Sequence, residues 1–196
     1  MKILLATHNK NKIIEITHAL QGSGHEVLSL DDFPDLPDVI EDGDTLEHNS
    51  LKKARELFEY SGITTLADDT GLEVDALNGE PGVYSARWAG EGCTYKDNCD
   101  KMLREMKGVP FEKRGAVFKC VITLYGKGVL KTASGELKGK IIDFERGSGG
   151  FGYDPVFMPD GYNITLAEMP LSEKNKISHR GLAVKKMAEI IRHIKP

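Results

Sequence analysis

The sequence predicts an α/β protein with a mixed β-sheet, folded as one domain over all 196 residues. Apolar runs typical of buried strands alternate with stretches of helical periodicity, which is the pattern of α/β folds. Two strand-like runs, Ala116 to Tyr125 and Val129 to Ala133, flank a Gly-Lys-Gly turn and predict a hairpin. A hairpin adds antiparallel strands, so we expect a mixed sheet. With 40% hydrophobic residues, a chain of this length can bury a large core without disulfides or metals.

The chain is predicted to begin with a buried strand over Met1 to Ala6, followed by a helix. Ile13, Ile16 and Leu20 recur at helical spacing up to two glycines that end the helix. The polar run Thr7 to Lys12 therefore joins a strand to a helix N-terminus, where backbone N–H groups and lysines can converge on a phosphate. The run lacks the glycines of a Walker A loop, and an ordinary polar turn is the alternative.

A second helix is predicted between Asp44 and Gly62. Asp44 and Glu47 have the spacing of a capping box, and Gly62 is a stop signal. On the side away from the apolar face of this helix, Asn49 and Lys53 lie one turn apart. Its apolar face consists of Leu46, Ala54, Leu57 and Phe58.

Two adjacent carboxylates, Asp68 and Asp69, follow an apolar strand that begins at Ile63, in a turn closed by Gly71. Side by side they repel each other, and a divalent cation between them or a proton on one of them would offset that cost. Glu41, before the second helix, is a further candidate oxygen ligand. A metal-assisted reaction is one interpretation of this segment, and a solvated turn is the other.

The second half of the chain is predicted to contain a helix from Thr94 to Gly108, a strand continuing over Leu137 to Ile142 and a short apolar run at Val156 to Met158. It ends in another helix. The apolar stripe of this last helix is made of Ala183, Met187, Ile190, Ile191 and Ile194.

Two polar segments in the second half are candidates for binding a base. Gly147 to Pro155 places two aromatic rings and an acid among glycines, so backbone can approach a ligand and a ring can stack on it. Lys174 and the run Ser178 to Arg180 offer hydrogen-bond donors. A loop with buried anchor rings and a solvated basic segment are the alternatives. Together with the lysines and carboxylates of the first half, these segments describe a nucleotide site.

The composition excludes several other classes. A net charge of −4 argues against nucleic acid as an obligate partner. The three cysteines lack the CxxC spacing of a zinc site, which indicates reduced thiols. The apolar N-terminal stretch is too short for a signal peptide or a membrane span, so we expect a cytoplasmic protein with no membrane partner.

Five segments carry a resemblance to a known family: ATHNKNK, EDGDTLEHNSLKKA, LADDTGLEVDALNGEPGVYSARWAG, GGFGYDPVF and SEKNKISHRGLA. In this order, spread over nearly the whole chain, they resemble the inosine triphosphate pyrophosphatases, also called dITP/XTP diphosphatases. The resemblance implies an elongated, two-lobed α/β structure with a central curved mixed sheet flanked by helices and an active-site cleft between the lobes. It also implies a homodimer that hydrolyses ITP, dITP and XTP to the monophosphate and pyrophosphate.

The resemblance also implies roles for single residues. Asp69 matches the family's proton acceptor and, with Glu41, its Mg²⁺ ligands; Mn²⁺ is the alternative metal and Asp68 an alternative ligand. Phe151 matches the ring that stacks on the base. Thr7, Asn9 and Lys12 are expected on the triphosphate with Lys53 nearby, Asp154 in the base-binding loop, and Lys174, His179 and Arg180 in the base-recognition set. Further residues expected to bind the substrate are His8, Lys10, Asn11, Thr70, Gly152 and Tyr153.

Two positions depart from the family pattern. His8 stands where the family usually has glycine, so the phosphate loop is expected to be stiffer or to gain a titratable donor. Thr70 stands where serine is usual, and it keeps the hydroxyl. We therefore expect the substrate contact of residue 70 to persist.

Three other functions are considered. A pyrophosphatase of the Maf type, acting on modified pyrimidine triphosphates, would use the same phosphate chemistry. A haloacid-dehalogenase-type phosphatase is disfavoured because the adjacent acids lack the DxD spacing. A nucleotide-binding regulator without turnover is disfavoured because the carboxylates would repel a triphosphate unless a metal intervened.

Overall fold

The computed structural model describes residues 1–194, apart from the side chain of Asn11. The predicted substrate contact of Asn11 therefore lies outside the described residues. The chain divides into two compact units. The first consists of Met1–Asp69, Cys120–Gly135 and the described residues from Arg180 onward, and the second of Thr70–Lys119 and Glu136–His179. Each unit has its own buried apolar core.

The strands belong to one sheet of seven strands. They are β1 (Lys2–Leu5), β2 (Glu26–Ser29), β3 (Thr65–Val74), β4 (Pro81–Gly82), β5 (Gly115–Gly126), β6 (Val129–Ile141) and β7 (Phe157–Pro159). Within the described chain the order is β2-β1-β3-β5-β6-β7, with β4 paired to β3. β1 is parallel to β2 and β3, whereas β4 is antiparallel to β3 and β7 to β6. The predicted α/β class with a mixed sheet is confirmed.

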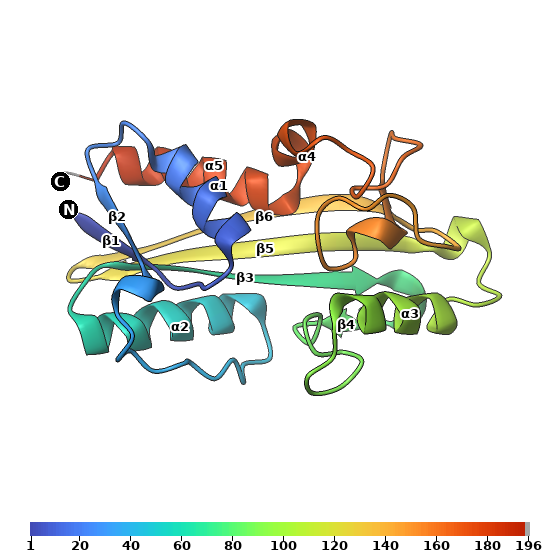
Figure 1. Cartoon of the computed structure of the whole chain (residues 1–196), viewed down its shortest axis with the longest axis horizontal. Coiled ribbons are helices and arrows are strands. Elements are labelled where there is room, and N and C mark those ends of the chain that lie inside the picture. The colour runs from blue at the N-terminus through green and yellow to red at the C-terminus, as the bar shows by residue number, and fades with distance from the viewer. Residues whose placement is uncertain (195–196) are drawn as a thin grey trace. The chain divides into compact units, whose positions relative to one another are not determined.

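In the first unit, helices cover both faces of the strands (Figure 1). α1 (Lys10–Leu20) and α5 (His179–Arg192) lie on one face, and α2 (Leu46–Ser61) lies on the other. Apolar side chains of α1 and α5 share one buried cluster with β1 and β5. Those of α2 share a second cluster with β3. Leu4 and Leu5 at the end of β1 pair with Thr65 and Leu66 of β3, so the polar loop that follows β1 starts beside β3.

The second unit contains α3 (Tyr95–Glu105) and α4 (Leu171–Ile177), which Figure 1 shows on opposite sides of the strands. Thr94 caps α3 as predicted: its side chain accepts a hydrogen bond from the N–H of Asp97, whose carboxylate accepts one in return. Met102 on the inner face of α3 is fully buried. Short 3₁₀ helices span Leu30–Asp32 in the first unit and Asp75–Leu77, Phe111–Lys113 and Asp154–Val156 in the second.

β3 continues through the segment where a turn was expected. The prediction of a turn closed by Gly71 is wrong, because the strand runs without a break from Thr65 to Val74. Leu72 and Val74 are fully buried. Burial of these two side chains outweighs the turn propensity of the preceding acids and glycine.

Two helix starts differ from the prediction. α1 begins at Lys10, so Lys10 and Lys12 lie in its first turn and not in a loop. The predicted capping box at Asp44 is wrong, because the side chain of Thr45 caps α2 by accepting a hydrogen bond from the N–H of His48. A threonine and an aspartate are both good N-caps, so the sequence leaves their order ambiguous. The end of α2 at a glycine is confirmed, with Gly62 in the left-handed region at φ +68°.

The two C-terminal helices, α4 and α5, also differ from the prediction. α5 begins at His179, so His179 and Arg180 belong to its first turn. α4, which carries Lys174, is not predicted from the sequence. A helix of seven residues shows too little periodicity to be recognised.

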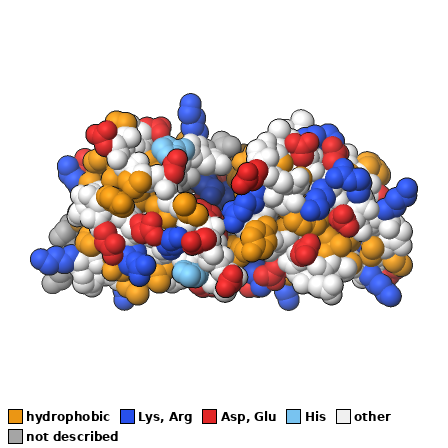
Figure 2. Space-filling view, turned by 90° about the horizontal axis from the view of Figure 1, so that it is seen from below, with side chains coloured by type: hydrophobic (Ala, Val, Ile, Leu, Met, Phe, Trp, Pro, Cys, Tyr) orange, Lys and Arg blue, Asp and Glu red, His pale blue; other side chains and the backbone are white. Residues whose placement is uncertain are grey.

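The surface is typical of a charged globular protein. No helix among residues 1–194 is long and apolar enough to cross a membrane. Figure 2 shows acidic and basic side chains interspersed over the face that carries α2. No continuous basic stripe of the kind that binds a nucleic acid backbone is visible on that face.

Candidate active site

Each unit holds one group of the predicted site residues. The first unit contains Thr7, His8, Asn9, Lys10, Lys12, Glu41, Lys53, Asp68, Asp69 and Arg180. The second contains Thr70, Phe151, Gly152, Tyr153, Asp154, Lys174 and His179. The residues expected around the phosphates thus belong mainly to the first unit, and those expected around the base mainly to the second.

The loop between β1 and α1 is held by its own side chains. Thr7 Oγ1 accepts a hydrogen bond from the N–H of Asn9 at 3.1 Å, and Asn9 Oδ1 accepts one from the N–H of Lys12 at 3.4 Å. Asn9 therefore caps α1, whose other first-turn N–H groups and dipole favour an anion. Lys10 is exposed, whereas the side chain of Lys12 is only 18% exposed.

His8 contacts residues outside this loop. Its Nδ1 lies 3.1 Å from Oδ1 of Asp31, and its Nε2 lies 3.9 Å from Oδ1 of Asp38. The His8 side chain is 61% exposed, so these contacts are screened and add little stability. They connect the loop to the segment after β2, and the stiffer loop expected from this position stays a prediction.

Asp68 is buried among cationic side chains. Its Oδ2 lies 2.7 Å from Nζ of Lys12 and 3.7 Å from Nε of Arg180, and its side chain is 1% exposed. Arg180 also approaches Glu15, at 3.8 Å. Burial alone would raise the pKa of Asp68, but the charges of Lys12, Arg180 and Lys53 outweigh it and hold the pKa well below its usual range. Asp68 therefore stays ionised, with its charge balanced by side chains.

Lys53 lies among three carboxylates. Its ammonium group forms an ion pair with Glu41. Burial would lower the pKa of Lys53, but the charges of Asp68, Glu41 and Asp69 outweigh burial and raise it. Lys53 therefore stays protonated, and it joins the metal-ligand candidates Glu41 and Asp69 in one electrostatic cluster.

Asp68 and Asp69 point to opposite faces of β3. Leu66 packs in the cluster formed with α1 and α5, and Ala67 packs in the cluster formed with α2. Strand alternation places Asp68 on the side of Leu66 and Asp69 on the side of Ala67. Contacts agree, because Asp69 Oδ2 accepts a hydrogen bond from Nδ2 of Asn49 in α2 at 3.0 Å. The interpretation of two carboxylates side by side with a cation between them is therefore wrong.

Asn49 is absent from the predicted site residues although it contacts Asp69. Its spacing of three residues from Leu46 places it beside the apolar face of α2. A polar side chain at such a position is buried and needs a hydrogen-bond partner. That spacing is the sequence signal that could have identified it.

Glu41 and Asp69 have the chemistry of a magnesium site. Mg²⁺ prefers oxygen ligands and is usually held by one or two carboxylates together with waters and substrate phosphates. Among the described residues there is no group of three or more His, Cys, Asp or Glu side chains arranged to hold a metal.

In the second unit, Asp154 organises the glycine-rich loop. Its Oδ2 accepts a hydrogen bond from the N–H of Phe151 at 2.8 Å and lies 2.5 Å from Nζ of Lys174. Asp154 and Lys174 are both buried. The Lys174 ammonium also lies 5.0 Å from the centre of the Phe151 ring, within the range of a cation–π contact. One carboxylate thus holds both the backbone of Phe151 and the ammonium group of the lysine expected at the base.

Tyr153 and Gly152 anchor the same loop to the core. The hydroxyl of Tyr153 donates to the carbonyl of Ser85 at 2.9 Å, and its ring is buried. The thiol of Cys99 donates to the carbonyl of Gly152 at 3.3 Å. Burial raises the pKa of Cys99 to about 12, so this thiol stays protonated and can donate. The ring of Tyr153 is therefore a buried anchor, as in the alternative interpretation of this loop.

His179 and Thr70 complete the second group. The imidazole of His179 is buried and stacks on the ring of Phe118, with the ring centres 4.6 Å apart and the planes inclined by 9°. This stacking fixes the plane in which His179 can offer a hydrogen bond. Thr70 follows Asp69 directly in β3 and is half-buried.

Gly150 is expected to be essential to the glycine-rich loop. Its φ is +71°, and a Cβ added there would collide with Oδ2 of Asp154. Gly150→Ala should therefore lower the free energy of unfolding by about 1–3 kcal/mol and raise KM for a nucleotide substrate. Gly161→Ala is the matched control, because Gly161 has φ +83° in the same unit with open space around it. Urea unfolding and KM measurements on both variants test this; an unchanged KM in Gly150→Ala would contradict it.

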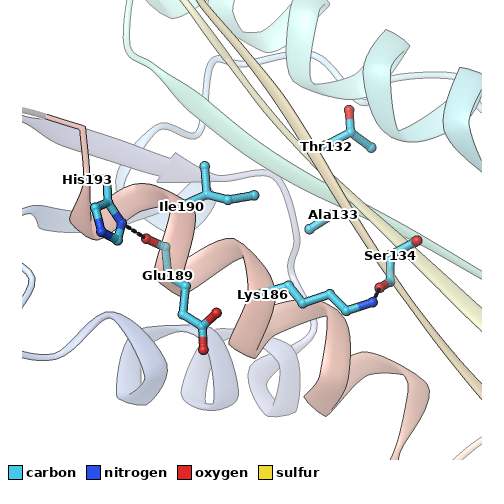
Figure 3. Close-up of a pocket in the computed structure, with 7 residues that line it drawn as sticks. All are labelled: Thr132, Ala133, Ser134, Lys186, Glu189, Ile190 and His193. Carbon is cyan, nitrogen blue, oxygen red and sulfur yellow. Dashed lines mark hydrogen bonds between the residues drawn. The ribbon is translucent and has the colours of Figure 1, made fainter.

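A shallow depression between β6 and α5 lies apart from the predicted residues (Figure 3). Lys186 donates to the carbonyl of Ser134 at 2.7 Å, and Nδ1 of His193 to the carbonyl of Glu189 at 2.7 Å. These bonds hold α5 to β6 and stabilise its last turn. No predicted site residue lines this depression.

Comparisons with known proteins agree with the motifs. The model of the Ham1 family matches residues 3–190. A dITP/XTP pyrophosphatase of Geobacter sulfurreducens is 50% identical over 184 residues, which cover 93% of this chain and 92% of the relative. One from Thermoanaerobacter sp. is 49% identical, over 97% and 96% of the two chains. A solved HAM1 protein from Coxiella burnetii superposes with a TM-score of 0.93 at 34% identity, over 99% of this chain and 100% of that one.

Proposed function

Because the chain belongs to the Ham1 family, we propose that it hydrolyses purine nucleoside triphosphates that carry a non-standard base. ITP, dITP and XTP are the substrates, and the monophosphate and pyrophosphate are the products, so that these nucleotides are removed from the nucleotide pool. Relatives named dITP/XTP pyrophosphatase, aligned over at least 92% of both chains, support this activity. The observation that carries the proposal is the cluster of lysines and carboxylates in the first unit, in which Lys12 pairs with Asp68 and Lys53 with Glu41.

Lys12 and Lys53 bind the triphosphate in this proposal. A nucleoside triphosphate brings about four negative charges, which compete with the carboxylates for both ammonium groups. The N-terminus of α1 adds backbone N–H donors beside Lys12. When Lys53 turns to a phosphate, Glu41 becomes available as a metal ligand.

Glu41 and Asp69 hold Mg²⁺ in this proposal, with Mn²⁺ as the alternative. When bound, the metal supplies charge neutralisation and withdraws electron density from the phosphate. Asp68 is assigned a different role because Lys12 and Arg180 already balance its charge. It anchors these two cations.

Asp69 orients the attacking water and accepts its proton. The water oxygen forms a bond to the α-phosphorus, the bond from that phosphorus to the bridging oxygen breaks, and pyrophosphate leaves. Positioning and charge neutralisation supply most of the reduction in barrier, as in other phosphoryl transfers.

Phe151 stacks on the base, and Lys174, His179 and Arg180 read its edge. Hypoxanthine and xanthine carry a 6-keto acceptor where adenine carries an amino donor. Donors aimed at this position are unpaired against ATP, at a cost of about 1–3 kcal/mol per mismatched group. The ion pair with Asp154 supports this role because it limits the motion of Lys174. Preference for ITP and XTP over ATP follows, whereas guanine shares the 6-keto group and is not excluded by this argument.

The protein acts as a homodimer in the cytoplasm in this proposal. The resemblance to the pyrophosphatase family supports the dimer. The three cysteines are free, which suits a reducing compartment.

Pyrophosphate release from a panel of nucleotides tests the proposed function. We expect rapid release from ITP, dITP and XTP, release from ATP that is slower by about tenfold or more, and none without a divalent metal. The panel should include GTP and a modified pyrimidine triphosphate. Preference for the pyrimidine would favour the Maf-type activity, and tight ITP binding without pyrophosphate release would indicate a regulator.

A further inference from the structure

A buried amide connects Asp69 to the loop that carries Glu41. Asn49, in the first turn of α2, is 1% exposed. Its Oδ1 accepts a hydrogen bond from the N–H of Gly43 at 2.7 Å, and its Nδ2 donates to Oδ2 of Asp69 at 3.0 Å. Only this orientation of the amide satisfies both neighbours, because an N–H needs an acceptor and an ionised carboxylate needs a donor.

Close packing at Gly43 supports this bridge. A Cβ added at Gly43 would lie 2.7 Å from Oδ1 of Asn49 and 2.8 Å from Cγ of His48. The loop backbone can approach α2 this closely only with glycine. Two residues earlier, Glu41 pairs with Lys53, also in α2. Asp42, between Glu41 and Gly43, pairs with Lys52 of the same helix. The loop is therefore attached to α2 at three points, and of the three α2 side chains Asn49 is the one that also hydrogen-bonds to Asp69 in β3.

From this geometry we infer that Asn49 is a positioning residue for both proposed metal ligands. Its bond to Oδ2 sets the orientation of the Asp69 carboxylate, and its bond to Gly43 sets the path of the loop that carries Glu41. Asn49 acts through these residues and does not touch the reacting atoms. The inference rests on the proposed function in so far as Glu41 and Asp69 bind the metal. Partners of this kind typically change metal affinity or activity by about 10–100-fold when removed.

Asn49→Ala tests the bridge by removing both hydrogen bonds. Mn²⁺ affinity of the protein with a non-hydrolysable ITP analogue bound, measured by water-proton relaxation against a protein-free control, should fall by about 10–100-fold, and kcat for ITP should fall by a similar factor with a smaller change in KM. Gly43→Ala disturbs the other end of the bridge and should change both quantities in the same direction. The double variant should lose little more than either single one, because both act on one bridge.

Asn98 offers a matched control. It is also 1% exposed and in a helix, with Oδ1 accepting from the N–H of Ala89 at 2.8 Å and Nδ2 donating to the carbonyl of Ala86 at 3.2 Å. Asn98→Ala should lower Tm and leave Mn²⁺ affinity and kcat unchanged. An equal loss of Mn²⁺ affinity in Asn98→Ala would overturn the inference, because it would indicate a general effect of losing a buried amide.

The remaining outcomes separate the inference from the proposed function. A folded Asn49→Ala protein with wild-type Mn²⁺ affinity and kcat would overturn the inference. If Asn49→Ala does not fold, the same two measurements on Gly43→Ala decide whether the inference holds. Wild-type protein that binds Mn²⁺ but does not hydrolyse ITP would refute the proposed function, while the Mn²⁺ comparison would still decide the role of Asn49. Wild-type protein that binds no Mn²⁺ even with the ITP analogue bound would overturn both.

Discussion

Asp69→Asn is expected to lower kcat for ITP by about 10²–10⁴-fold, the usual contribution of a positioned acid–base group. The amide oxygen of the new side chain can still accept the hydrogen bond from Asn49, so the geometry around β3 should persist. An amide cannot take a proton from water at neutral pH, and it is a weaker metal ligand than a carboxylate. Turnover should therefore fall far more than substrate binding. Steady-state kinetics and equilibrium binding of ITP in the presence of Mg²⁺ measure the two effects separately.

Asp42→Asn is the control for this substitution. Asp42 follows Glu41 directly and pairs with Lys52 at 2.5 Å, but its side chain is 64% exposed. Loss of such an exposed, solvent-screened pair changes stability little and should leave kcat unchanged. Full activity in Asp69→Asn would rule out Asp69 as the proton acceptor. A large loss of kcat in Asp42→Asn would show that any acid removed near Glu41 impairs the enzyme.

Local signals predicted the elements around the phosphate loop. A short apolar strand followed by helical periodicity predicts β1, α1 and the polar loop between them, since each depends on residues close in sequence. Gly62 ends α2 in the left-handed region, which the sequence also indicates. The predicted starts of α1 and α2 differ only slightly from the observed ones at Lys10 and Thr45. Nearby residues there have similar capping propensity, so the sequence leaves the exact start ambiguous.

Local sequence patterns do not reveal which residues distant in the chain contact each other in the fold. Nothing near Asp68 indicates that Lys12 and Arg180, far away in the chain on either side, meet its carboxylate. Turn propensity predicted a break at Gly71, but burial of Leu72 keeps the strand going. That continuation sends Asp68 and Asp69 to opposite faces and gives them different partners. Tertiary packing, which a local pattern does not contain, decides the role of each acid.

Asp68→Asn should lower the free energy of unfolding by about 3–5 kcal/mol, the usual cost of breaking a buried ion pair by removing one partner. The substitution leaves Lys12 and Arg180 facing a neutral amide, and the Arg180 side chain is only 6% exposed. Because the pKa of Asp68 is lowered in the folded protein, its contribution is fully present above the unfolded pKa of about 4 and is lost as pH falls through the folded pKa. Urea unfolding of both proteins should therefore differ most near neutral pH and converge in acid.

A double-mutant cycle with Lys12→Met separates the ion pair from other effects of the substitution. If the pair carries the stability, the two single variants should each be destabilised and the double variant should lose less than their sum. Asp31→Asn removes an exposed partner of His8 and should change stability by about 1 kcal/mol or less. Additive losses at Lys12 and Asp68, or a loss at Asp68 no larger than that at Asp31, would show that Asp68 does not anchor the cations. Asp68 would then be open to a direct role with the metal, the alternative that its balanced charge now argues against.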